Sequence, residues 1–191
     1  MAAAKAVFID ARWRFASAVS LVALLLLICP QAPDLLMWER SAITDGELWR
    51  WMTAHLVHLS LMHCLSNLLG LLLICEYLWD ELALADACAL LLWTAAGTSL
   101  LLWWFAPEID WYAGLSGVLH GLWAGCALAW FCRSGDRVAA AALALLAIKL
   151  ALPSYGLSAL PVVTVAHGYG ALCGLIWAVF RARARRHGFF G

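Results

Sequence analysis

Long apolar stretches dominate this sequence and restrict what it can fold into. Five of them carry no charged residue and a sixth carries only Lys149; they cover residues 15–33, 51–75, 87–107, 111–132, 138–152 and 161–180. A helix needs about 20 mainly apolar residues to cross a bilayer. We therefore predict an all-α membrane protein, a bundle of six transmembrane helices. It forms a single domain over residues 1–191, with a helical core of about residues 13–181.

The composition excludes several other classes of protein. Hydrophobic residues make up 65% of the chain and charged residues 13%, whereas an average soluble domain is about 25% charged. A soluble domain of this size buries only roughly 70% of its unfolded-chain surface, so it has too little interior for so many apolar side chains. Twelve basic residues balance twelve acidic ones, so no net field attracts nucleic acid. The expected surroundings are a lipid bilayer.

Basic residues near both ends of the chain predict its orientation. Lys5, Arg12 and Arg14 precede the first stretch, and four arginines follow the last one, at positions 181, 183, 185 and 186. Cytoplasmic segments are enriched in Lys and Arg, and an even number of spans brings both ends to one side. We predict cytoplasmic termini, with the first loop (about residues 30–54) and the loop around residues 153–161 facing outward.

The first stretch has two explanations. A secretory signal peptide is one, because basic residues precede it. However, no convincing cleavage site with small residues follows Ile28-Cys29-Pro30, and five more apolar stretches come after it. We therefore predict an uncleaved helix.

Polar side chains inside the stretches mark a candidate site. His63 and Asn67 are four residues apart, as are Ser116 and His120, and His167 lies in the last stretch. Residues four apart share a helix face, and polar groups at membrane depth are costly and usually functional. Each also has a structural explanation. A serine can bond a carbonyl of its own helix, and His63 with Asn67 can join neighbouring helices.

Small residues indicate which stretches pack together. The fourth and sixth stretches carry glycines at every fourth position, namely Gly117, Gly121 and Gly125 in one and Gly170 and Gly174 in the other. Such strips let two helix backbones approach closely in lipid. The predicted topology makes these two helices parallel, so Ser116 and His167 should lie at similar depth, near the outer surface. A hydroxyl beside an imidazole is a nucleophile with its base.

Several motifs resemble those of the rhomboid family of intramembrane serine proteases. The resemblance spans about residues 44–180 and rests on Glu47-Leu-Trp49-Arg50, His63-Cys-Leu-Ser-Asn67, Gly114-Leu-Ser116-Gly117 and Ala166-His167-Gly-Tyr-Gly170-Ala-Leu-Cys-Gly174. These are similar to the family's E-x-W-R, H-x-x-x-N, G-x-S-G and A-H-x-x-G-x-x-x-G. The resemblance implies a six-helix fold in which Ser116 is the nucleophile and His167 the general base. It also implies that His63 and Asn67 stabilise the oxyanion.

One position departs from the common pattern. Many rhomboids carry a tyrosine four residues after the serine, where its ring stacks on the catalytic histidine, whereas this chain has His120. The resemblance implies that His120 orients His167. The run Gly-Leu-Ser-Gly-Val-Leu-His-Gly from residue 114 resembles the rhombosortase subfamily of bacteria. That subfamily is implied to act in the inner membrane, with a site open to the periplasm, on proteins whose C-terminal transmembrane anchor contains Gly-Gly.

Other functions are weighed against this one. A rhomboid protease with other single-pass substrates fits the same residues. Catalytically inactive relatives act in binding or trafficking, but they usually lack the serine or the histidine. A histidine-ligated redox or metal protein is the third class. The chain has six histidines but neither H-E-x-x-H nor C-x-x-C, so we predict no metal and no cofactor.

Lys149 is the charge inside the fifth stretch. Its ammonium group either extends to the membrane surface or meets an acidic or terminal group of a substrate. A substrate helix is expected to enter laterally near the second and fifth helices. The sequence leaves both explanations of Lys149 open.

Overall fold

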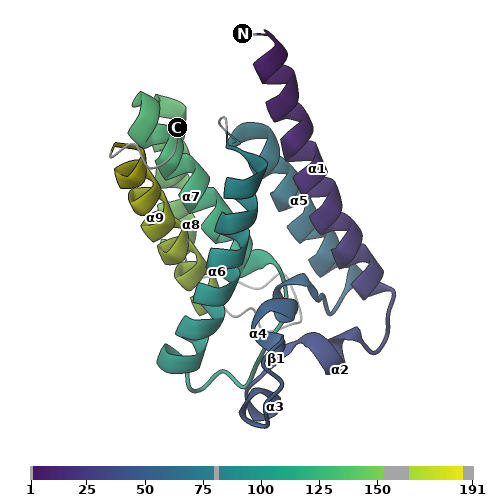
Figure 1. Cartoon of the computed structure of the whole chain (residues 1–191). Coiled ribbons are helices and arrows are strands. Elements are labelled where there is room, and N and C mark those ends of the chain that lie inside the picture. The colour runs from purple at the N-terminus through teal and green to yellow at the C-terminus, as the bar shows by residue number, and fades with distance from the viewer. Residues whose placement is uncertain (1, 80–81, 153–163, 187–191) are drawn as a thin grey trace.

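The computed structural model describes residues 2–79, 82–152 and 164–186, and helices dominate it (Figure 1). The long helices in these residues are α1 (Ala2–Leu27), α5 (Leu61–Tyr77), α6 (Leu84–Phe105), α7 (Ser116–Ser134), α8 (Arg137–Ala151) and α9 (Thr164–Arg186). Shorter elements are α2 (Ala32–Leu36), β1 (Trp38–Glu39), α3 (Arg40–Thr44), α4 (Arg50–Thr53), the 3₁₀ turn η1 (Ala54–Leu56) and β2 (Trp111–Tyr112). The loop predicted around residues 153–161 lies outside the described residues.

Some of these helices are long and apolar enough to cross a membrane by themselves. Among the described residues, α6 and residues 164–184 of α9 qualify. A third span results if Arg50–Leu56 and α5 are taken together, although a bend of 90° separates them. These helices agree with the prediction of an all-α membrane protein.

Two predicted spans begin later than the sequence indicates. The second was expected from residue 51, but α5 begins only at Leu61, because extended Ser60 interrupts the helix and its Oγ accepts the His63 N–H (3.2 Å). The fourth was expected from Trp111, but α7 begins at Ser116. Gly114 has a φ of +119°, which lies outside the helical region and favours glycine.

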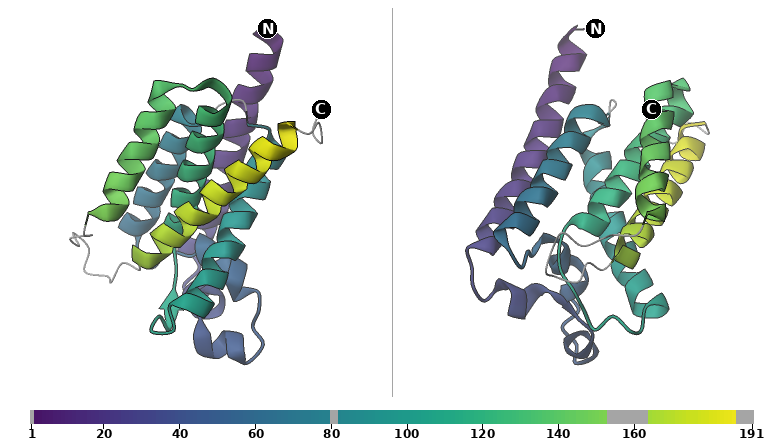
Figure 2. Two further views of the ribbon diagram at one scale, coloured as in Figure 1. Left: turned by 90° about the vertical axis from the view of Figure 1, so that its left-hand side faces the viewer. Right: turned by 180° about the vertical axis from the view of Figure 1, so that it is seen from behind.

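Helix α7 is central and packs against α6, α8 and α9 (Figure 2). A Cβ at Gly121 would lie 2.8 Å from the Gly170 carbonyl oxygen, and one at Gly125 would lie 3.3 Å from that of Gly174. Each step of four residues along α7 therefore matches a step of four along α9, so the two helices are parallel and nearly in backbone contact. The start of α1 and the end of α9 lie at the same end of the molecule (Figures 1 and 2).

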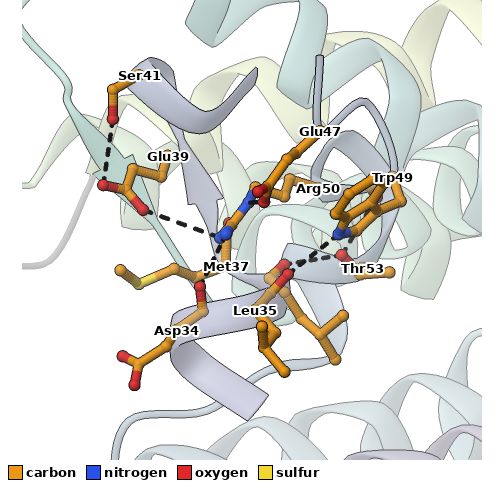
Figure 3. A network of polar contacts seen from close by, with 10 residues as sticks. Asp34, Leu35, Met37, Glu39, Ser41, Glu47, Trp49, Arg50 and Thr53 are labelled. Carbon is orange, nitrogen blue, oxygen red and sulfur yellow. Dashed lines mark hydrogen bonds and ion pairs between the residues drawn. The ribbon is translucent and has the colours of Figure 1, made fainter. Parts of the chain in front are cut away.

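The first loop is held together by Arg50, which is only 4% exposed (Figure 3). Its guanidinium bonds the Glu47 carboxylate (2.6 Å) and donates to the carbonyl oxygens of Met37 (2.9 Å) and Asp34 (2.8 Å). The Trp49 indole N–H donates to the Leu35 carbonyl (3.0 Å). The E-x-W-R motif thus gives a short, mostly irregular segment its fixed shape.

Two further contacts fasten this loop to the membrane helices. Arg40 donates to the carbonyl oxygens of Leu102 (3.2 Å), Trp103 (3.2 Å) and Ala106 (3.0 Å) at the C-terminal end of α6, where backbone carbonyls commonly accept from side chains. Strand β1 pairs antiparallel with β2, with Trp38 opposite Tyr112. The loop therefore supports the chain that leads into α7.

Candidate active site

Ser116 is the first residue of α7 and follows a tight, buried turn. The Tyr112 hydroxyl donates to the Gly114 carbonyl (2.7 Å) and accepts the Gly117 N–H (3.2 Å). Tyr112 is only 2% exposed, and a phenol with an ordinary pKa of about 10 keeps its proton and remains a donor at neutral pH. Sequence reasoning missed Tyr112, because nothing local to it indicates this role.

The side chains of Ser116 and His167 meet across the seam between α7 and α9. His167 Nε2 lies 3.0 Å from Ser116 Oγ, within hydrogen-bonding distance. His167 is buried (8% exposed) and occupies the first turn of α9. The parallel glycine strips keep the two helix starts at one level, so the contact follows from backbone packing as well as from side-chain choice.

His120 lies one turn after Ser116 and faces His167. The two imidazole rings stack, with centroids 4.2 Å apart and planes inclined by 10°. His120 Nδ1 also lies 2.6 Å from the Ser116 carbonyl oxygen. The ring is therefore attached to the helix that carries the hydroxyl while it covers one face of His167.

Lys149 reaches this group from α8. Its Nζ lies 2.8 Å from His120 Nε2. The two sequence-based explanations of Lys149 were a surface position and a substrate contact, and neither included a protein partner. The only sequence signal is a lone cation in an apolar stretch, which does not identify the histidine it contacts.

His63 and Asn67 flank the turn before Ser116 from α5. A Cβ at Gly114 would lie 2.6 Å from His63 Cε1, 2.7 Å from His63 Nε2 and 3.7 Å from Asn67 Nδ2. Within the described part of the chain, Asn67 Nδ2 is buried and has no hydrogen-bond partner. A buried donor without an acceptor is costly, so this amide is available to bind a group that arrives at the site.

A groove of about 780 Å³ opens onto this cluster. Residues of α5, α7 and α8 line it, together with His167 of α9. Ser116, His120 and Lys149 lie toward one end, and the lining continues over apolar side chains such as Leu73, Trp123 and Leu145. The lining residues of α5, from Ser66 to Tyr77, cover about 17 Å of helix.

The sequence model of the rhomboid domain matches residues 45–184. The chain belongs to the rhomboid family. No match was found among curated proteins. Rhomboids are generally intramembrane serine proteases, so the family match agrees with a polar cluster and an apolar groove inside a helical membrane protein. The predicted resemblance is confirmed at the family level, whereas the rhombosortase assignment stays a prediction.

Proposed function

We propose that this rhomboid is an active intramembrane serine protease with Ser116 as nucleophile and His167 as general base. The proposal rests on the 3.0 Å contact between Ser116 Oγ and His167 Nε2 at the wall of the groove. Ser116 Oγ attacks a peptide carbonyl carbon while His167 Nε2 takes its proton. The imidazolium then protonates the leaving amine, which departs and leaves Ser116 acylated. Water attacks the acyl-enzyme while His167 takes its proton, and the new carboxylate is released as the Ser116 hydroxyl is regenerated.

The oxyanion of the tetrahedral intermediate needs donors, and three are proposed. They are the Ser116 backbone N–H, Asn67 Nδ2 and the His63 imidazole. Asn67 Nδ2 is the best supported, because it is buried, has no partner among the described residues and lies beside the turn that precedes Ser116. Such donors stabilise charge that develops only in the transition state.

Asn67→Ala is expected to lower kcat by about 10²–10³-fold with little change in KM, because one oxyanion donor is lost. Asn67→Asp has almost the same shape but replaces the amide donor with an anion, so it should lower kcat at least as much. The measurement is steady-state cleavage of a single-pass substrate in detergent or vesicles. Near-normal kcat in Asn67→Asp would show that Asn67 serves packing instead.

The groove is the proposed site of the substrate's membrane segment. It lies between α5 and α8, is lined mostly by apolar side chains and ends at Ser116, so a helix lying in it would present its outer end to the hydroxyl. We propose the rhombosortase substrate class, membrane-anchored proteins with a C-terminal Gly-Gly-containing transmembrane tail. Co-expression with such a protein, and with a single-pass protein that lacks the tail, distinguishes this class from a general rhomboid protease.

The proposed topology places six helices across the bacterial inner membrane. They are α1, α5, α6, α7, α8 and α9, with both termini cytoplasmic and the groove's catalytic end toward the periplasm. The common end of α1 and α9 (Figure 2) and the basic residues near it support this orientation. The bilayer is thus the working environment, and the first loop packs at the periplasmic side.

A fluorophosphonate probe tests the proposed function directly, because it reacts with activated serines. Wild-type protein in native membranes should be labelled, and both Ser116→Ala and heat-denatured wild type should not. Equal labelling of wild type and Ser116→Ala would eliminate Ser116 as nucleophile. Absence of labelling in folded wild type would favour an inactive relative that acts in binding or trafficking.

A further inference from the structure

Lys149 is the single charged residue between positions 138 and 152, in a helix whose other side chains are all apolar over that range. A cation inside a membrane segment is costly and is kept where it has a partner or a function. Its amine contacts His120 Nε2 at 2.8 Å and lines the groove beside Ser116 and His167. The mechanism above does not use this amine.

The hydrogen bonds of His120 define which ring nitrogen carries the proton. The Ser116 carbonyl oxygen, 2.6 Å from Nδ1, can only accept, so Nδ1 carries hydrogen. The neutral ring then has an unprotonated Nε2, which accepts from the Lys149 ammonium group. Lysine is the stronger base of the two, so the proton between these nitrogens rests on Lys149 and His120 remains neutral.

These two bonds hold the His120 ring at opposite edges. Nδ1 is hydrogen-bonded to the Ser116 carbonyl of α7 and Nε2 to the Lys149 amine of α8. The ring therefore cannot turn about its Cβ–Cγ bond without breaking both hydrogen bonds. Its face stacks on His167 at 4.2 Å, and His167 in turn directs Nε2 to the Ser116 hydroxyl. A ring fixed at both edges therefore limits the motion of the base.

We propose that Lys149 is a positioning residue that acts through His120, fixing its Nδ1–H tautomer and its stacked orientation so that His167 faces Ser116. This inference rests on the proposed function. A residue without a ring nitrogen at position 120 would leave the Lys149 amine without this acceptor. The lysine and the histidine are therefore expected to work as a pair.

The test is a double-mutant cycle on the full-length protein, read as the rate of fluorophosphonate labelling of Ser116. Lys149→Met should slow labelling by about 10–100-fold, by analogy with the cost of removing a partner that orients a metal-ligating histidine. Lys149→Arg, which keeps a cationic donor, should recover most of the rate. Ile148→Met, next to it on α8 and outside the groove lining, is the matched control and should be unchanged.

The decisive comparison uses His120→Phe, which keeps an aromatic face but has no ring nitrogen. In that background Lys149→Met should cost nothing or should speed labelling, because the lysine has lost its acceptor and is an unpaired cation. Coupled residues show such non-additivity, whereas independent ones do not. An equal loss from Lys149→Met in both backgrounds would overturn the inference, as would unchanged labelling in the single variant.

A second measurement does not depend on activity. ¹⁵N NMR of the protein, with His120 assigned from His120→Phe, distinguishes protonated from unprotonated ring nitrogens. We expect protonated Nδ1 and hydrogen-bonded, unprotonated Nε2 in wild type, with Nε2 losing its hydrogen-bond shift in Lys149→Met. A protonated Nε2 with bare Nδ1 in wild type would overturn the inference. If wild type shows the expected ¹⁵N pattern but does not react with the fluorophosphonate probe, only the proposed function is refuted.

Discussion

Gly170→Ala is expected to force α7 and α9 apart and to abolish labelling of Ser116. A Cβ at residue 170 would overlap the carbonyl oxygen of Gly117, which is backbone and cannot rotate away as a side chain can. Overpacking of this kind costs about 1–3 kcal/mol and occasionally more. Because Gly117 follows Ser116 and Gly170 lies one turn from His167, the two reacting atoms should separate as well.

The size of this effect follows from how steeply catalysis depends on position. A misplacement of about 1 Å can cost about 10²-fold in rate, so labelling should fall by at least that factor even where the protein remains folded. Thermal unfolding in detergent, measured on the same preparations, should show a lower midpoint. The same change at Gly174, whose Cβ would overlap the Gly121 carbonyl oxygen, should act alike.

Gly168→Ala is the matched control on the same helix. It lies between His167 and Gly170, yet a Cβ there has no neighbour within 4 Å among the described residues. The change should leave labelling unaltered and, because alanine favours a helix over glycine by about 1 kcal/mol, should not lower the unfolding midpoint. If Gly170→Ala behaved like Gly168→Ala, the close seam between α7 and α9 would be contradicted.

The close contact between α7 and α9 is also the part of the fold that the sequence predicts most directly. Small residues at every fourth position in two apolar stretches predict a close contact, and counting spans predicts that the two helices are parallel. The parallel register of Gly121 with Gly170 agrees with this. Periodicity is a property of a short segment, so it can be recognised without any knowledge of the rest of the molecule.

Other features depend on contacts that no local pattern encodes. The late start of α5 reflects the capping Ser60, and that of α7 reflects the positive φ of Gly114. Both residues lie within uncharged apolar stretches, so the extent of a stretch does not show where its helix begins. Arg50 and Arg40 hold the first loop by donating to backbone carbonyls. Every residue has a backbone carbonyl, so the sequence does not indicate which ones accept these bonds. The Lys149–His120 contact joins residues 29 positions apart on two helices, so only the folded chain reveals it.

His167→Gln is expected to lower kcat for peptide cleavage by at least about 10³-fold, because the variant has no base to take the Ser116 proton. Glutamine retains a polar side chain of similar length, so the loss would reflect proton transfer more than packing. The measurement is cleavage of an anchored substrate, with KM and the unfolding midpoint recorded for each variant. Both should change far less than kcat.

The double variant Ser116→Ala/His167→Gln supplies the control. Two residues that act as one unit are not additive, so the pair should be no slower than Ser116→Ala alone. A double variant in which the two losses multiply would be incompatible with His167 as the base.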